Sequence, residues 1–312
     1  MTAVLMLRAL GLGDFLTGVP AYRALRRAYP DAETVLAAPA ALRPLAALTG
    51  AIDRLLPAGE LRPIPWQGPP PEVAVDLHGN GPASHALIDA TRAPLRMMYA
   101  SATAPDVDGP WWDDDEHEVA RWCRLVGRWG IPADPGDLRL RAPAEEPPVR
   151  RAAVVHPGAA YPARRWPPDR FAAVARALAA EGHPVVITGT AGERDLAAAV
   201  ADRAGLPAAA VLAGTTGLEG LAALVADAAV VVSNDTGLSH LATAYGVPSV
   251  TLFGPVSPAL WGPPEGGPHV ALWHGSGGRP GNAHGTETDP RLLRITVEEV
   301  LAALTALRQP AA

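Results

Sequence analysis

The stretch SNDTGLSHLATAYGVPSVTLFGP, from Ser233 to Pro255, is the most informative part of this 312-residue chain. It follows the apolar run AAVVV and combines the end of a strand, a polar turn and the start of a helix. From Ser233 to Gly237 it offers short oxygen-bearing side chains and main-chain N–H groups, where the helix dipole favours an anion such as a diphosphate. Each polar residue taken alone can instead serve only as a helix cap, and that alternative stays open.

The second half of this stretch, GVPSVTLFGP, indicates a turn, a buried strand and another Gly-Pro turn. Two strand ends then deliver loops to one edge of a sheet, which is where open α/β sheets bind ligands. The same order of strand, turn and helix recurs along the chain, beginning with TAVLML, GLGD and FLTGVPAYRALRRAY. Alternating strands and helices predict an α/β fold with parallel sheets covered on both faces.

The segment APAEEPPVRR, from Ala142 to Arg151, has the proline and charge content of a linker. A second series of strands and helices begins directly after it with AAVVHPG. We therefore predict a first Rossmann-like domain over residues 1–145, a second over residues 150–290, and a final helical segment over residues 291–312.

Composition narrows the function classes. The net charge is −6, from 26 basic and 32 acidic residues, and no basic block is interleaved with aromatic residues, which argues against a nucleic-acid partner. The single cysteine, Cys123, is expected in the core of an amphipathic helix. The N-terminus lacks a signal-peptide pattern and no apolar run is long enough to span a membrane, so a cytoplasmic location is expected.

The acidic run WWDDDEHE, from Trp111 to Glu118, is interpreted as a solvated helix start. Adjacent carboxylates on a helix do not face one point, so a metal site there is not favoured. No other cluster of His, Cys and carboxylates has metal-ligand spacing, and we expect no obligatory metal or other cofactor. The GLGDFL turn lacks the third glycine of a dinucleotide fingerprint, which argues against hydride transfer.

Several segments, in order, resemble those of glycosyltransferase family 9, the group that contains the ADP-heptose lipopolysaccharide heptosyltransferases. They are LRALGLGDFLTGVPAYRALRRAYP, VDLHGN, HPGAAYPARRWPPDRF, GTAGERD and GLEGLAALVADAAVVVSNDTG. The resemblance implies the GT-B arrangement, with two doubly wound Rossmann-like domains and an interdomain cleft. It also implies an acceptor held mainly by the first domain, a nucleotide-sugar donor held mainly by the second, and a last helix that packs back on the first domain.

Asp14 is the candidate general base, because it lies in the exit turn of the first strand and matches the family's GD motif. Its alternative role is to cap a helix that begins at Phe15. On the acceptor side, Gly13, His78, Asn80 and His85 are candidates by location only.

The donor-side candidates come from the second domain. Main-chain N–H at Gly158 and the guanidinium groups of Arg164 and Arg165 suit a departing diphosphate, with solvated surface charge as the alternative for the arginines. The resemblance assigns ribose contact to Glu219, and Trp166 is expected to be a packing residue. The remaining candidates for the diphosphate and sugar are Asp235, Thr236, Gly237, Leu238 and His240.

Together these features predict an inverting, metal-independent glycosyltransferase that moves a sugar from a nucleotide diphosphate donor to a hydroxyl acceptor. The resemblance alone implies that the sugar is heptose-like and ADP-activated. The acceptor class is a glycan, a lipid-linked molecule or a small molecule, and a monomer with peripheral membrane contact is expected. Two alternatives remain: a non-hydrolysing nucleotide-sugar 2-epimerase and a non-catalytic nucleotide-sugar binding protein.

Overall fold

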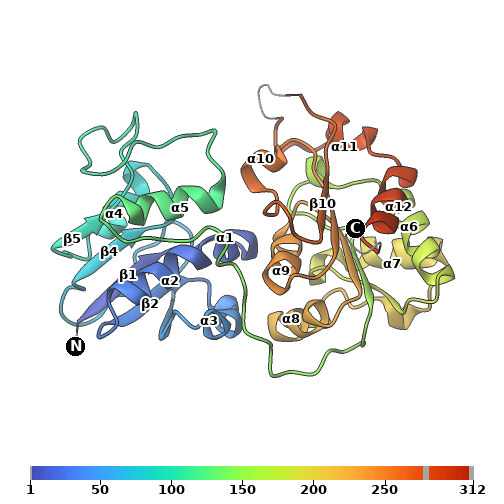
Figure 1. The fold of residues 1–312 in the computed structure, drawn as a ribbon, viewed down its shortest axis with the longest axis horizontal. Coiled ribbons are helices and arrows are strands. Elements are labelled where there is room, and N and C mark those ends of the chain that lie inside the picture. The colour runs from blue at the N-terminus through green and yellow to red at the C-terminus, as the bar shows by residue number, and fades with distance from the viewer. Residues whose placement is uncertain (1, 277–280, 309–312) are drawn as a thin grey trace. The chain divides into compact units, whose positions relative to one another are not determined.

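The computed structural model describes residues 2–276 and 281–308, and its contacts divide the chain into two compact units. Unit 1 is Met1–Arg141, blue to green in Figure 1, and unit 2 is Ala142–Ala312, green to red. The division falls at the start of the proline- and charge-rich segment. Each unit contains one parallel five-stranded sheet, so the α/β fold with two Rossmann-like units is confirmed.

Unit 1 has the strand order β3-β2-β1-β4-β5. Its central strand is buried at every position, as expected for a parallel sheet with both faces covered. The strands are β1 (Ala3–Leu7), β2 (Glu33–Ala38), β3 (Arg54–Pro57), β4 (Val73–Asp76) and β5 (Leu95–Met97). The helices are α1 (Leu12–Thr17), α2 (Val19–Ala28), the short 3₁₀ turn η1 (Ala40–Leu42), α3 (Arg43–Thr49), α4 (Pro82–Asp89) and α5 (Glu118–Gly127). Cys123 is buried in α5, as expected.

The first helix differs from the expectation. It begins at Leu12 rather than Phe15, with Gly11 in an extended conformation at its N-cap, so Asp14 lies inside the first turn and is not the cap. The helix then breaks at Gly18 into α1 and α2. A Cβ atom on Gly18 would lie 2.4 Å from the Tyr22 hydroxyl oxygen, so only glycine lets Tyr22 pack there.

Unit 2 has the strand order β10-β9-β8-β6-β7. Its strands are β6 (Ala153–His156), β7 (Val185–Ile187), β8 (Val230–Asn234), β9 (Ser249–Leu252) and β10 (His269–Leu272). Its α-helices are α6 (Pro168–Ala180), α7 (Arg194–Ala204), α8 (Leu218–Ala226), α9 (Gly237–Tyr245), α10 (Pro258–Trp261), α11 (Pro290–Arg294) and α12 (Val297–Ala306). Short 3₁₀ turns are η2 (Pro162–Arg164), η3 (Ala191–Glu193) and η4 (Ala208–Ala210).

The last helix packs within unit 2, and its expected contact with the first domain stays a prediction. Helix α12 contacts α6 and β9, and Val300, Ala303 and Leu304 belong to the buried core of unit 2. The predicted single helix is also divided into α11 and α12, because Ile295 is extended and Thr296 forms a capping box with Glu299. The apolar face of α12 is therefore satisfied within its own unit.

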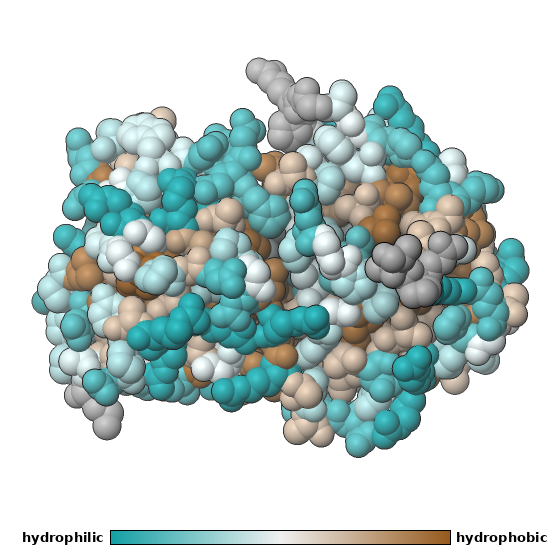
Figure 2. Space-filling model, in the orientation of Figure 1, coloured by the Kyte–Doolittle hydropathy of each residue, from teal (hydrophilic) through white to brown (hydrophobic). Residues whose placement is uncertain are grey.

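The visible face of the molecule shows hydrophobic residues scattered among hydrophilic ones (Figure 2). Within the described ranges, no helix has both the length and the apolar character needed to cross a membrane.

Trp166 is the packing residue that the sequence predicts. Its side chain is 1% exposed, its indole N–H donates to the Ile295 carbonyl oxygen at 3.0 Å, and its ring meets Phe171 edge to face. Trp166→Ala should lower the free energy of unfolding by about 3–5 kcal/mol in chemical denaturation, because the cavity lies in the core of unit 2. Leu293→Ala, at a side chain that is 42% exposed, is the control and should change stability by about 0.5 kcal/mol or less. Equal losses for both variants would contradict this prediction.

Candidate functional site

Each sheet has a point where the direction of strand addition reverses, and ligands of open α/β sheets bind at the carboxyl ends of strands there. In unit 1 this point lies between β1 and β4, and in unit 2 it lies between β6 and β8. The segments that leave these strands carry Asp14 and His78 in unit 1, and Gly158, Arg164 and Asp235 in unit 2. Most predicted site residues therefore lie at the two binding edges that the topology defines.

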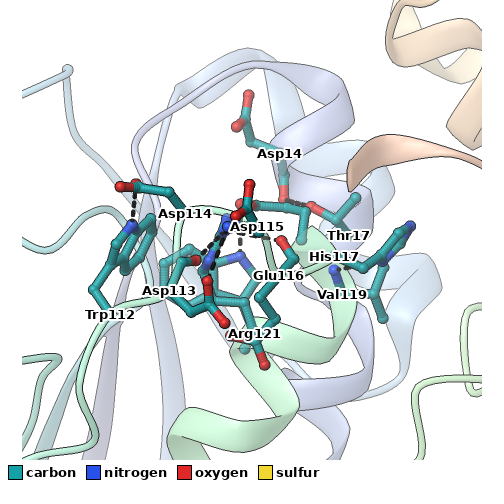
Figure 3. Close-up of polar contacts among 12 residues, drawn as sticks. Asp14, Thr17, Trp112, Asp113, Asp114, Asp115, Glu116, His117, Val119 and Arg121 are labelled. Carbon is teal, nitrogen blue, oxygen red and sulfur yellow. Dashed lines mark hydrogen bonds and ion pairs between the residues drawn. The ribbon is translucent and has the colours of Figure 1, made fainter. Parts of the chain in front are cut away.

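Asp14 occupies the first turn of α1, directly after Gly13 (Figure 3). The side chain is 30% exposed, and its Oδ1 lies 3.8 Å from Nη2 of Arg8. Partial burial raises the pKa of the Asp14 carboxyl, Arg8 lowers it, and Glu118 raises it again. A carboxylate with a raised pKa that still reaches solvent is suited to accept a proton.

Arg8 is a residue that the sequence prediction missed. It follows β1, is fully buried, and donates to the main-chain oxygens of Asp14 and Leu77 and to the Thr17 hydroxyl. Its role could have been predicted from its position, because an arginine at the end of a buried strand requires hydrogen-bond acceptors within the fold.

Glu118 is the second missed residue, and the interpretation of the whole acidic run as solvated is wrong at this position. The side chain is 5% exposed and accepts from Arg8, Arg121 and the Trp122 indole N–H. Arg121 also donates to the main-chain oxygens of Asp113 and Glu116, so the backbone of the acidic run curves around the Arg121 guanidinium (Figure 3). Asp113, Asp114 and Asp115 are exposed, as the solvated interpretation expects.

The end of β4 holds the acceptor-side candidates. Nδ1 of His78 accepts from the main-chain N–H of Ala9 at 3.2 Å, so the neutral ring carries its proton on Nε2. Burial, with a contribution from Arg8, lowers the pKa of His78 and favours that neutral form. The main-chain oxygen of Asn80 accepts from Ser101.

His85 is buried on α4, and its Nε2 lies 3.8 Å from Oδ2 of the buried Asp76. Burial raises the pKa of Asp76 to about 6, while hydrogen bonds from Ser84, His78 and Gly79 oppose that rise. His85 thus lies against Asp76 inside the unit, whereas His78 is only half-buried at the strand end.

In unit 2, Asn234 joins the loops that follow β6 and β8. Its side chain accepts from the Trp166 main-chain N–H at 3.0 Å and donates to the Pro157 and Gly158 carbonyl oxygens at 2.9 and 3.2 Å. A Cβ atom on Gly158 would lie 2.2 Å from Oε1 of Glu193, so a larger residue there would displace that carboxylate. The hydrogen bond from Asn234 fixes the Gly158 carbonyl group.

The two predicted arginines have different partners. Arg164 donates through Nη2 to the Asp235 carboxylate at 2.7 Å and to the Asp235 main-chain oxygen. Arg165 donates through Nε and Nη2 to the Ala159 carbonyl oxygen at 2.9 and 2.7 Å. Arg164 thus links the β6 loop to the start of α9, while Arg165 closes its own loop.

Thr236 is the N-cap of α9, and its hydroxyl accepts from the Leu238 main-chain N–H. Thr236 therefore caps α9, its role at the donor stays a prediction, and the first turn begins with Gly237 at a partly exposed position. His240, one turn later, meets the Trp261 ring at 5.9 Å between centroids. Glu219 is exposed in the first turn of α8.

Comparisons with known proteins find similar sequences in one enzyme family. Residues 109–273 match the model of glycosyltransferase family 9 (heptosyltransferase). Over 190 residues the chain is 30% identical to lipopolysaccharide heptosyltransferase 1 of Pseudomonas aeruginosa, a match that covers 59% of this chain and 51% of that protein. The chain thus spans about half the length of this curated relative, and 30% of the Salmonella typhimurium lipopolysaccharide heptosyltransferase 2, to which it is 40% identical over 108 residues.

Solved structures extend the likeness over the whole chain. The E. coli ADP-heptose lipopolysaccharide heptosyltransferase II superposes with a TM-score of 0.77 at 25% identity, over 98% of each chain. The iron-containing dodecameric glycosyltransferase TibC of enterotoxigenic E. coli superposes with a TM-score of 0.65 at 15% identity, over 98% of this chain and 76% of that one. These likenesses place both units in the GT-B fold.

The Arg164–Asp235 pair generates a pH-dependent prediction. Burial raises the pKa of Asp235 and Arg164 opposes that rise, so Arg164→Gln should raise the folded-state pKa further above its unfolded value. The variant should lose roughly 1–3 kcal/mol of unfolding free energy at pH 7. This loss, relative to the wild type, should shrink as the pH falls from 7 to 5. Asp235 in the folded variant takes up its proton at a higher pH than in the folded wild type, and that uptake stabilises the folded variant.

The measurement is chemical unfolding at several pH values. Arg165→Gln is the matched control. The Arg165 guanidinium bonds a carbonyl oxygen, which does not titrate, so the loss of unfolding free energy in this variant should not vary with pH. A loss for Arg164→Gln that is equally independent of pH would show that the ion pair does not control the charge of Asp235.

Proposed function

Because this chain belongs to glycosyltransferase family 9, we propose that it transfers a heptose-like sugar from an ADP-activated donor to a hydroxyl acceptor. The curated relatives are named as lipopolysaccharide heptosyltransferases, and a lipid-linked glycan is the acceptor class that we propose here. The observation that carries the proposal is the chemistry at the two switch points: a partly exposed carboxylate in unit 1, and an arginine at a helix N-terminus in unit 2.

The proposed reaction is a single displacement. Asp14 accepts the proton of the acceptor hydroxyl, and the acceptor oxygen forms a bond to the anomeric carbon. The bond from that carbon to the diphosphate oxygen breaks, the diphosphate leaves with the electron pair, and the configuration at carbon inverts. His78 can orient the acceptor, since its Nε2–H is the free end of a ring whose Nδ1 is already bonded.

Residues of unit 2 stabilise the departing diphosphate in this proposal. Main-chain N–H groups at the start of α9 and of the loop at Gly158 suit phosphate oxygens, and the helix dipole adds positive potential. Arg164 brings its guanidinium to the same helix start through Asp235, so a diphosphate there would share the arginine with that carboxylate. We assign Glu219 to the ribose, and the start of α9, from Thr236 to Leu238 with His240 one turn later, to the diphosphate and sugar.

Asp14→Asn is the direct test of the base. Transfer should fall by about 10²-fold or more, because the amide cannot accept the proton. Donor affinity should be unchanged, which thermal stabilisation by a panel of nucleotide sugars measures. Asp114→Asn, in the exposed part of the acidic run, is the control and should keep full activity. A wild-type protein that binds a donor without turnover would point instead to a binding protein, and an epimerised donor would point to an epimerase.

We also propose that transfer needs no metal ion. In residues 2–276 and 281–308 no group of three or more His, Cys, Asp or Glu side chains is arranged to hold one, and Arg164 with the α9 N-terminus supplies positive potential. Activity should therefore survive dialysis against EDTA. Loss of activity that Fe²⁺ or Mg²⁺ restores would contradict this proposal, and the iron named for TibC makes Fe²⁺ the informative addition.

A further inference from the structure

Arg8 is a fully buried cation beside the candidate base. Its Nε donates to the main-chain oxygen of Asp14, and Thr17, which also bonds that oxygen, accepts from Arg8 Nη2 at 3.0 Å. Its Nη1 donates to the Leu77 carbonyl oxygen, directly after β4. One side chain thus ties the first turn of α1 to the neighbouring strand end, which limits where the Asp14 carboxyl can lie.

Glu118 is the counter-ion that lets Arg8 stay charged in the core. Its Oε1 lies 2.9 Å from Nη2 of Arg8 and accepts from the Trp122 indole N–H at 2.8 Å, and its Oε2 accepts from Arg121. The Arg8 guanidinium also lies 4.7 Å from the centre of the Trp122 ring. Burial opposes the ionisation of Glu118, but Arg8 and Arg121 outweigh it and lower its pKa.

The charges that face Asp14 and Arg8 come from several elements. Arg8 lies at the end of β1, Glu118 begins α5, and the buried Tyr22 hydroxyl on α2 faces both Asp14 and Arg8. At the end of β4, His78 and Asp76 face Arg8. Arg8 and Glu118 are hydrogen-bonded to each other, and their charges act on Asp14 in opposite directions.

We propose that Arg8 and Glu118 form a positioning pair that holds the Asp14 carboxyl in place and sets how strongly it binds a proton. This inference rests on the proposed role of Asp14 as the base. Arg8 supplies the hydrogen bonds and a charge that favours the carboxylate. Glu118 cancels most of that charge, so that Asp14 remains basic enough to take a proton from a hydroxyl group.

The pair predicts shifts of opposite sign in the acid limb of the rate profile. Glu118→Gln removes the negative charge and keeps the shape, so the limb of log kcat against pH should move to lower pH by about 1 unit. Arg8→Gln removes the positive charge, so the limb should move to higher pH by about 1 unit. The double variant carries neither charge, and its limb should return close to that of the wild type. Its kcat should nevertheless fall about tenfold or more, because the main-chain oxygen of Asp14 has lost the hydrogen bond from Arg8 that fixes the turn.

Glu116→Gln is the matched control. Glu116 lies in the same acidic run and pairs with Arg124, away from Arg8, so its limb should not move. If a single variant fails to fold, the double variant remains, because it does not leave Arg8 or Glu118 as a buried charge without its partner. A double variant with wild-type kcat, or a folded Glu118→Gln whose limb stays in place, would overturn the proposal.

A second measurement separates this inference from the proposed reaction. The Asp14 carboxyl can be titrated by ¹³C NMR of labelled protein, with Asp14→Asn used to assign its signal, and no turnover is needed. A lower Asp14 pKa in Glu118→Gln and a higher one in Arg8→Gln would support the pair even if Asp14→Asn kept its activity. Unchanged titration in both variants would overturn it even if Asp14 proved to be the base.

Discussion

An arginine that leaves solvent needs a carboxylate beside it, and both units meet this need at the switch point of their sheet. In unit 1 the pair is Arg8 with Glu118, and in unit 2 it is Arg164 with Asp235. Each pair joins segments far apart in the sequence, by 110 and 71 residues. The loops that carry the candidate chemistry are thus fixed by charge as well as by the strands from which they emerge.

The two pairs differ in how much charge they leave available. Arg8 is fully buried and surrounded by hydrogen-bond acceptors. Its charge therefore acts on the Asp14 carboxyl from within the core, and a ligand cannot contact the guanidinium directly. Arg164 keeps 27% of its side chain exposed at a helix start, where an anionic ligand can reach it. We propose that the same pair of residue types tunes a base in one unit and receives an anion in the other.

The local parts of this architecture could be predicted from the sequence. The spacing of apolar residues and the Gly and Pro residues between segments indicated the strands. The Ser233–Pro255 stretch identified the start of α9 because the turn, the cap and the helix are contiguous in the sequence. The partners of Arg8 could not be predicted in the same way, since Glu118 stands in an acidic run that looks solvated and only the fold turns it inward. The surface that the last helix covers in unit 2 could not be predicted either, because an apolar face shows that a helix must pack, but not on which surface.

The amide of Asn234 has a consequence for the cost of ligand binding. By bonding to Trp166, Pro157 and Gly158 at once, it keeps the β6 loop in one conformation without help from a ligand. A molecule that arrives at this loop does not have to remove its conformational entropy, which otherwise costs roughly 1–2 kcal/mol per residue ordered. Affinity at this edge of unit 2 then depends on the contacts themselves, since the rigidity was acquired when the chain folded.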